Sequence, residues 1–107
     1  MEMKVVLSKN DDGSTEIYFV KVRHWDDFDL IVGLLQQEND CQILSNQEAV
    51  YMRVAKLKWK HMEFIAKHDD MLGNFLYTEN SNDVIVLEQL ANNVVDSIKI
   101  KLANRQQ

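Results

Sequence analysis

The segment AKHDDMLGN, residues 66–74, places a histidine directly before two carboxylates, residue types that bind metals and transfer protons in enzymes. His68 with Asp69 or Asp70 could therefore belong to a metal-dependent hydrolase. Two ligands are fewer than the three that catalytic zinc usually takes from a protein. His61 does not supply the third, because two residues seven apart on one strand are about 23 Å apart and lie on opposite faces. The hydrolase stays an alternative, and we assign no catalytic or metal-binding residue.

A hairpin turn explains the same segment more completely. Asp69 and Asp70 can accept hydrogen bonds from backbone amides two residues further on, and Gly73 can supply a positive φ. Asn74 tolerates similar backbone geometry, and β-type sequence lies on both sides. We therefore expect the tip of a β-hairpin here, whose two carboxylates could also contact a protein partner.

Other signs of catalysis are weak. Cys41 is the only cysteine, so it can form no disulfide within the chain, and its place at the start of a strand suits a small half-buried residue better than a nucleophile. The adjacent acids of NDDG, WDDFD and HDDM would point to opposite faces of a strand, whereas glycosidase chemistry needs two carboxyl groups across one cleft. The chain contains no phosphate-binding glycine loop, nucleophile elbow or HExxH motif. We expect no cofactor.

The charges are unevenly distributed along the chain. It carries 17 acidic and 12 basic residues, a formal net charge of −5, which argues against general affinity for nucleic acids or anionic membranes. The basic residues gather in the middle, where Lys56, Lys58 and Lys60 would share one face of a strand and make nucleic-acid binding a second alternative. The aromatic neighbours Tyr51 and Trp59 would point to the opposite face. We therefore expect a solvated strand instead.

Alternation of apolar residues predicts the strands. A turn-forming segment, KNDDGST, separates the first two and predicts a β-hairpin. The expected strands are residues 3–8, 17–22, a weak strand or loop at 41–47, two strands within 50–67 with a turn around 58–61, and 74–78.

A period of about 3.6 residues predicts two amphipathic helices. The first begins at His24 and ends near Asn39, with Asp26, Asp27 and Asp29 at its positive end. The second opens at Asp83. The apolar stripe of the first helix is Trp25, Phe28, Ile31, Val32 and Leu35, and that of the second is Val84, Leu87, Leu90, Ala91, Val94, Val95, Ile98 and Leu102.

This order, β-β-α-β-β-β-α with hairpin-length connections, predicts a single α+β domain over residues 1–107. We expect a mostly antiparallel sheet of four to five strands, with the two helices packed side by side on one face. No proline, internal repeat or low-complexity linker divides the chain.

Two leucines of the first helix, Leu30 and Leu34, lie away from its apolar stripe. A wide buried face between the helices would explain both. If they are exposed instead, they mark a protein interface, either with a foreign partner or in a homodimer.

These features favour a small acidic protein-binding module without catalytic activity. No apolar run approaches the roughly 18 residues of a membrane span, and the N-terminal MEMKVVLSKNDDG lacks the pattern of a secretory signal, so we expect a cytoplasmic protein. Charge favours a basic protein partner, and an immunity-type inhibitor of a basic toxin is one specific form of this hypothesis. The residues expected at the contact are Leu30, Leu34, Asp69 and Asp70.

Overall fold

The computed structural model describes residues 2–105, which form six strands, two α-helices and one turn of 3₁₀-helix. The strands are β1 (Lys4–Lys9), β2 (Thr15–Val20), β3 (Gln42–Glu48), β4 (Met52–Trp59), β5 (Met62–Asp69) and β6 (Gly73–Thr78). The helices are α1 (Trp25–Glu38), η1 (Ser81–Asp83) and α2 (Val84–Arg105).

All six strands belong to one sheet in the order β1-β2-β6-β5-β4-β3, and every neighbouring pair is antiparallel. The α+β class and the antiparallel sheet are confirmed, but the expected four to five strands are too few. The sequence QILSNQE of β3 shows no apolar alternation, and yet it pairs with β4 as an edge strand, with a bulge between Ile43 and Ser45. Pairing with a neighbour, rather than its own pattern, makes this segment a strand.

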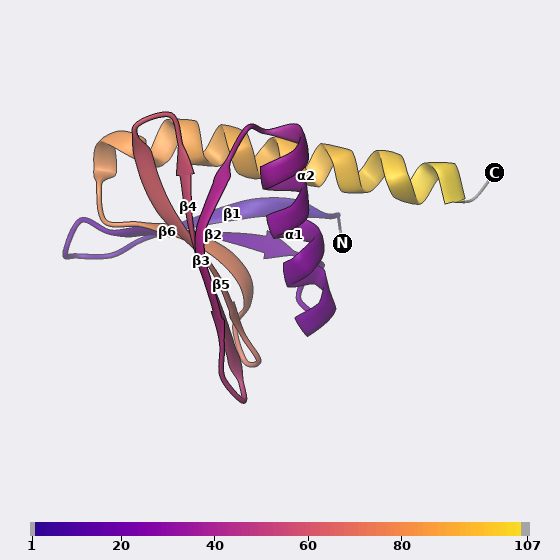
Figure 1. Ribbon diagram of the computed structural model, residues 1–107, viewed down its shortest axis with the longest axis horizontal. Helices are drawn as coiled ribbons and strands as arrows, with labels where there is room; N and C mark the ends of the chain where they lie inside the picture. Colours follow the sequence, from indigo (N-terminus) through magenta and orange to yellow (C-terminus); the bar gives the residue numbers. More distant parts are fainter. Residues whose placement is uncertain (1, 106–107) are drawn as a thin grey trace.

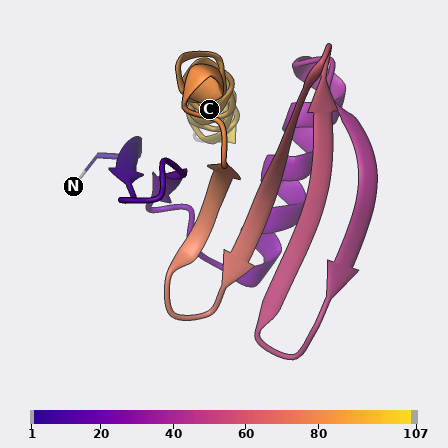
Figure 2. The same cartoon turned by 90° about the vertical axis from the view of Figure 1, so that its left-hand side faces the viewer.

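The sheet is strongly twisted. In Figure 1, β1 and β2 run nearly horizontally and β3 to β5 nearly vertically, because the twist between neighbouring strands accumulates across the sheet. α2 lies across the top of this view, and in Figure 2 α1 lies behind β4 and β5. We call the sheet face turned toward the helices the inner face and the opposite one the outer face.

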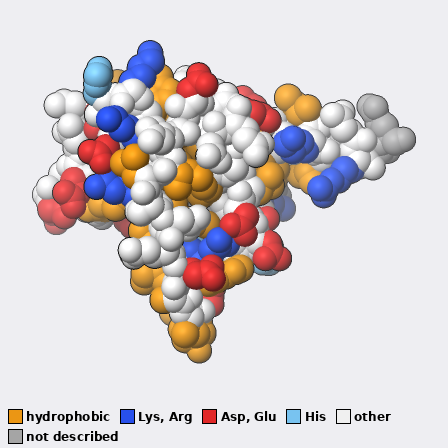
Figure 3. Space-filling model, viewed as in Figure 1, with side chains coloured by type: hydrophobic (Ala, Val, Ile, Leu, Met, Phe, Trp, Pro, Cys, Tyr) orange, Lys and Arg blue, Asp and Glu red, His pale blue; other side chains and the backbone are white. Residues whose placement is uncertain are grey.

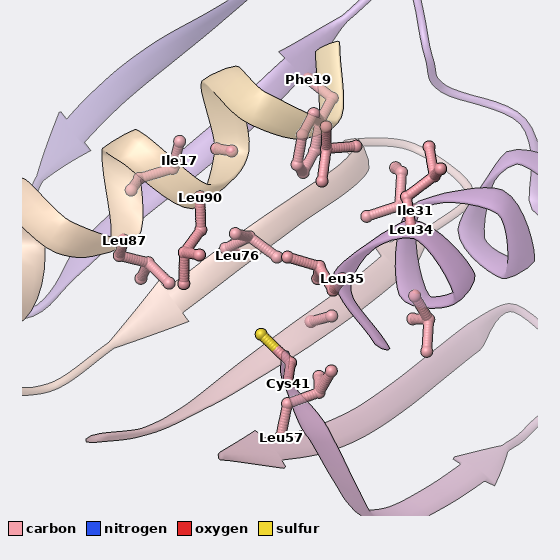
Figure 4. Packing of buried hydrophobic residues seen from close by; sticks show 14 of the residues in the cluster. Ile17, Phe19, Ile31, Leu34, Leu35, Cys41, Leu57, Leu76, Leu87 and Leu90 are labelled. Atoms are coloured by element: carbon pink, nitrogen blue, oxygen red, sulfur yellow. The ribbon is translucent and has the colours of Figure 1, made fainter. Parts of the chain in front are cut away.

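Alternate strand residues and both helices share one hydrophobic core. Ile17 of β2, Leu57 of β4 and Leu76 of β6 are fully buried on the inner face. Leu35 of α1 and Leu87 of α2 are buried in the same cluster, as Figure 4 shows. α1 contacts α2, β5 and β6, whereas α2 contacts β1, β2 and β6. The inner face of the sheet is thereby closed off from solvent at its centre.

The first helix has the limits that the sequence predicts. His24 precedes its first residue, and the backbone N–H of His24 donates to Asp27 Oδ2 over 3.0 Å. At the other end Asn39 Nδ2 donates to the Leu34 carbonyl over 3.1 Å, and Asn93 of α2 donates to Asn39 Oδ1 over 3.1 Å. The end of α1 is thereby attached to α2.

Within residues 2–105, no helix is both long enough and apolar enough to cross a membrane.

Candidate functional site

His68, the histidine that the sequence offered as a metal ligand or catalytic residue, lies on the inner face of β5 and is only 1% exposed. Its Nδ1 is 2.9 Å from Asn74 Oδ1, and its Nε2 is 2.8 Å from Asp70 Oδ1. Asn74 Nδ2 in turn donates to the carbonyl oxygens of Val22, over 2.8 Å, and His24, over 3.1 Å. Because those two carbonyls fix the orientation of the amide, both ring nitrogens of His68 face oxygens that accept hydrogen bonds.

This arrangement leaves His68 without a free ring nitrogen for a metal ion or a substrate. Asp69 points elsewhere, because its Oδ1 accepts hydrogen bonds from the amides of Met71 and Leu72 in the turn between β5 and β6. His61 is exposed at the opposite end of β5. Across residues 2–105 no group of three or more His, Cys, Asp or Glu side chains is placed to hold a metal. The geometry therefore gives the metal-dependent hydrolase no ligand set.

The expected hairpin turn is present, with one difference. Asp69 caps it, and Gly73 adopts a φ of 88°. Asn74, however, is a buried strand residue rather than a turn former. The sequence also missed the bond from Asp70 to His68, which joins this half-exposed carboxylate to the buried histidine.

A second buried polar group lies next to His68. Arg53 of β4, the register partner of His68 on β5, donates two hydrogen bonds to Asp29 of α1, over 2.9 Å and 2.6 Å. Its guanidinium carbon is 5.1 Å from the ring centre of Trp25 and 4.8 Å from that of Phe28. Asp29 raises the pKa of the Arg53 guanidinium, and the same pairing lowers the pKa of the Asp29 carboxyl.

Trp25 connects the two groups, because its ring also meets the His68 ring edge to face, with centres 5.4 Å apart. We call Asp29, Arg53, His68, Asp70 and Asn74 the inner polar network. It ties the start of α1 to three neighbouring strands. Since its hydrogen bonds are made within the protein, its role is to position these elements.

The turns at the same end of the sheet carry exposed apolar side chains. Val50 and Tyr51, between β3 and β4, are 77% and 70% exposed, and Met71, between β5 and β6, is 85% exposed. The two turns are joined by a hydrogen bond from the Asp70 amide to the Tyr51 carbonyl over 3.2 Å. With their less exposed neighbours they form what we call the tip cluster: Val50, Tyr51, Met52, Met71 and Leu72. Figure 3 shows hydrophobic side chains at the lowest point of the molecule, where Figure 1 places these turns.

The tip cluster escaped the sequence analysis, although a signal was present. The segments AVYM and ML occupy turn positions where polar residues, glycine and proline are usual. Of the two leucines away from the stripe of α1, Leu34 is 3% exposed and belongs to the core, as a wide buried face predicts, whereas Leu30 is 37% exposed, so the two form no exposed pair. The apolar face of α1 is wider than its stripe, because it packs against both the sheet and α2.

The remaining candidates are accounted for by local contacts. Lys56 and Lys58 are exposed on the outer face, where Lys56 pairs with Glu63 over 3.3 Å. Lys60 lies over the ring of Trp59, 4.5 Å from its centre. Cys41 is buried, and burial raises the pKa of its thiol to about 11, with a smaller effect of Asp40. A thiol in this environment is not a nucleophile at neutral pH.

Comparison of the chain with protein-family models, curated protein sequences and solved structures gave no significant match.

Proposed function

We propose that this protein is a small cytoplasmic binding domain without catalytic activity, and that the tip cluster is its protein-binding surface. The observation that carries the proposal is the exposure of Val50, Tyr51 and Met71 side by side on two joined turns. Apolar patches of this kind on a small domain typically mark a contact with another protein, since exposing them to water costs free energy.

The support beneath the tip cluster suits a binding surface. The turns are anchored to the inner polar network through Asp70, and Arg23 adds a hydrogen bond from Nη2 to the Met71 carbonyl over 3.0 Å. A partner would therefore meet side chains on a backbone that is already ordered, and it would lose little free energy in ordering them.

Charge favours a basic partner with its own apolar side chains. The carboxylates of Asp29 and Glu48 are largely exposed, while the one guanidinium that they share, Arg53, is buried between them. Asp69 and Asp70 flank the second turn, with the cations Lys21, Arg23 and Lys67 near them. The chain as a whole carries a formal net charge of −5, and this negative charge is complementary to a basic partner. The immunity-type inhibitor of a basic toxin is one form of this proposal, and it rests on charge alone.

Selection of a phage-displayed random peptide library on the intact protein tests the proposal. We expect the selected peptides to combine aliphatic or aromatic residues with lysine or arginine, and to bind less tightly as the salt concentration rises. Replacing two side chains of the tip cluster, Tyr51→Ser with Met71→Ser, should weaken binding by about tenfold or more.

The matched control is Ile85→Ser, because Ile85 is an equally exposed apolar residue (81%) on α2, away from the turns. Peptides that bind the tip variant and the parent protein equally well would refute the assignment of the surface. Peptides without basic residues would refute the assignment of the partner's charge.

A further inference from the structure

The outer face of the sheet carries a mostly apolar row, which neither α1 nor α2 covers within residues 2–105. Strand register places Val6, Tyr18, Phe75, Lys67 and Val54 beside one another across five strands, from β1 to β4. Phe75 is only 3% exposed, because its neighbours on the outer face enclose it, and its ring centre is 5.0 Å from that of Tyr18. In Figure 2 α1 lies on the far side of β4 and β5.

The row borders a hollow on the outer face. Its volume is about 370 Å³, and its lining includes Phe75, Ile65, Val54 and Tyr77 as well as the exposed Leu72. Glu16 and Asp69 line the same hollow together with Lys67. A solvated strand face would carry polar side chains at these positions, so an apolar floor indicates a surface that is buried against another protein.

The charges of the outer face are balanced, unlike those of the whole chain. The chain carries −5, but the outer face holds four lysines and three carboxylates: Lys4, Lys56, Lys58, Lys67, Glu16, Glu63 and Asp69. A strongly basic or strongly acidic partner would gain nothing from such a mixture. A surface that carries both signs can match itself, as the contact of a two-fold dimer must.

The shape of the sheet points to the same occupant. A twisted sheet is saddle-shaped, and a saddle fits a copy of itself that has been turned over about an axis along its central strand. Sheets packed face to face in proteins keep their strand directions within about 30° for this reason. The outer face spans six strands, or about 24 Å across at roughly 4.8 Å between strands.

We propose that the outer face binds the outer face of a second copy of this chain, around a two-fold axis along β6. This axis sets β2 of one copy over β5 of the other and β1 over β4. Val6 then meets Val54 of the second copy, and Tyr77 meets its own equivalent, above the enclosed ring of Phe75. Glu16 then lies over Ile65 of the second copy, and Lys67 is the next outward residue of that strand. The two side chains can pair diagonally on each side of the axis, and this pair is the electrostatic part of the contact.

Sedimentation equilibrium of the intact protein over a range of concentrations tests the dimer. We expect twice the mass of one chain at high concentration. Glu16→Lys and Lys67→Glu should each raise the dissociation constant by about tenfold or more, because either change opposes like charges at two symmetric places. An equal mixture of the two variants should dimerise again, since both charge pairs then have opposite signs.

Asp96→Lys is the matched control, because it makes the same change of charge at an exposed position of α2. Thermal melts followed by circular dichroism establish that each variant is folded. If one variant is unstable by itself, its equal mixture with the other variant provides the test instead. A single-chain mass at every concentration would overturn the proposal and leave the outer face to a different partner. A dimer that both charge reversals leave unchanged, or a mixture that does not restore association, would overturn it as well.

Discussion

The inner polar network and the tip cluster lie at the same end of the sheet and differ in almost every physical respect. The network contains the ionisable side chains that resemble an active site, and they are bonded to one another: Arg53 to Asp29, and His68 to both Asp70 and Asn74. The tip cluster contains no Asp, Glu, Lys, Arg or His side chain and is exposed to water. The network therefore acts within the fold, whereas the tip cluster is the part that still lacks a contact.

The largest expected effect is that of Arg53→Ala. It removes a buried side chain that packs between Trp25 and Phe28, and it leaves the carboxylate of Asp29 without its partner. We expect the free energy of unfolding to fall by about 3 kcal/mol, as measured by urea denaturation. Lys56→Ala on the outer face of the same strand is the control, with a change within about 0.5 kcal/mol. Equal effects at both positions would remove the distinction between the network and the surface.

The next effect is that of Asn74→Ala. The change leaves the carbonyls of Val22 and His24 and one nitrogen of His68 without their hydrogen-bond partner in a buried place. The free energy of unfolding should fall by about 2 kcal/mol in the same urea measurement.

Asp70→Asn should lower the free energy of unfolding by less, about 1 kcal/mol, because the replacement keeps an oxygen near His68 at a half-exposed position. A loss from Asp70→Asn as large as that from Asn74→Ala would contradict the hydrogen-bond pattern.

The parts of this fold that could be predicted are those with local causes. The turn capped by Asp69, the positive φ of Gly73 and the limits of α1 follow from residues within a few positions of one another. The hairpin between β4 and β5 also follows, because apolar alternation continues on both sides of it.

The parts that could not be predicted depend on distant partners. Asn74 bonds to a carbonyl 52 positions away, and Arg53 to a carboxylate 24 positions away, so no local pattern marks either residue. Leu34 became core because α1 packs against two elements at once. β3 became a strand because β4 offers it a free edge.

A smaller effect is expected from pH. The pairing with Arg53 lowers the pKa of Asp29 from 3.8, so the unfolded chain takes up this proton at a higher pH than the folded protein does. The stabilisation is complete above about pH 5 and is lost as the pH falls through the lowered pKa. Its size is about 1 kcal/mol or less, because the Asp29 side chain is 64% exposed and solvent screens the pair. In urea denaturation at several pH values, Asp29→Asn should flatten the acid limb of the stability curve, whereas Asp96→Asn, at an exposed position of α2, should not.

The smallest effect on stability is expected from the tip cluster itself. Tyr51→Ser with Met71→Ser removes side chains that are 70% and 85% exposed, so little apolar contact is lost and unfolding free energy should stay within about 0.5 kcal/mol of the parent. The same variant is the one expected to lose peptide binding. A stability loss as large as that of Asn74→Ala would mean that these side chains support the fold, and the contrast with the inner polar network would fail. Unchanged stability together with lost binding would separate the two regions by function, because only a surface kept for a partner can be removed without cost to the fold.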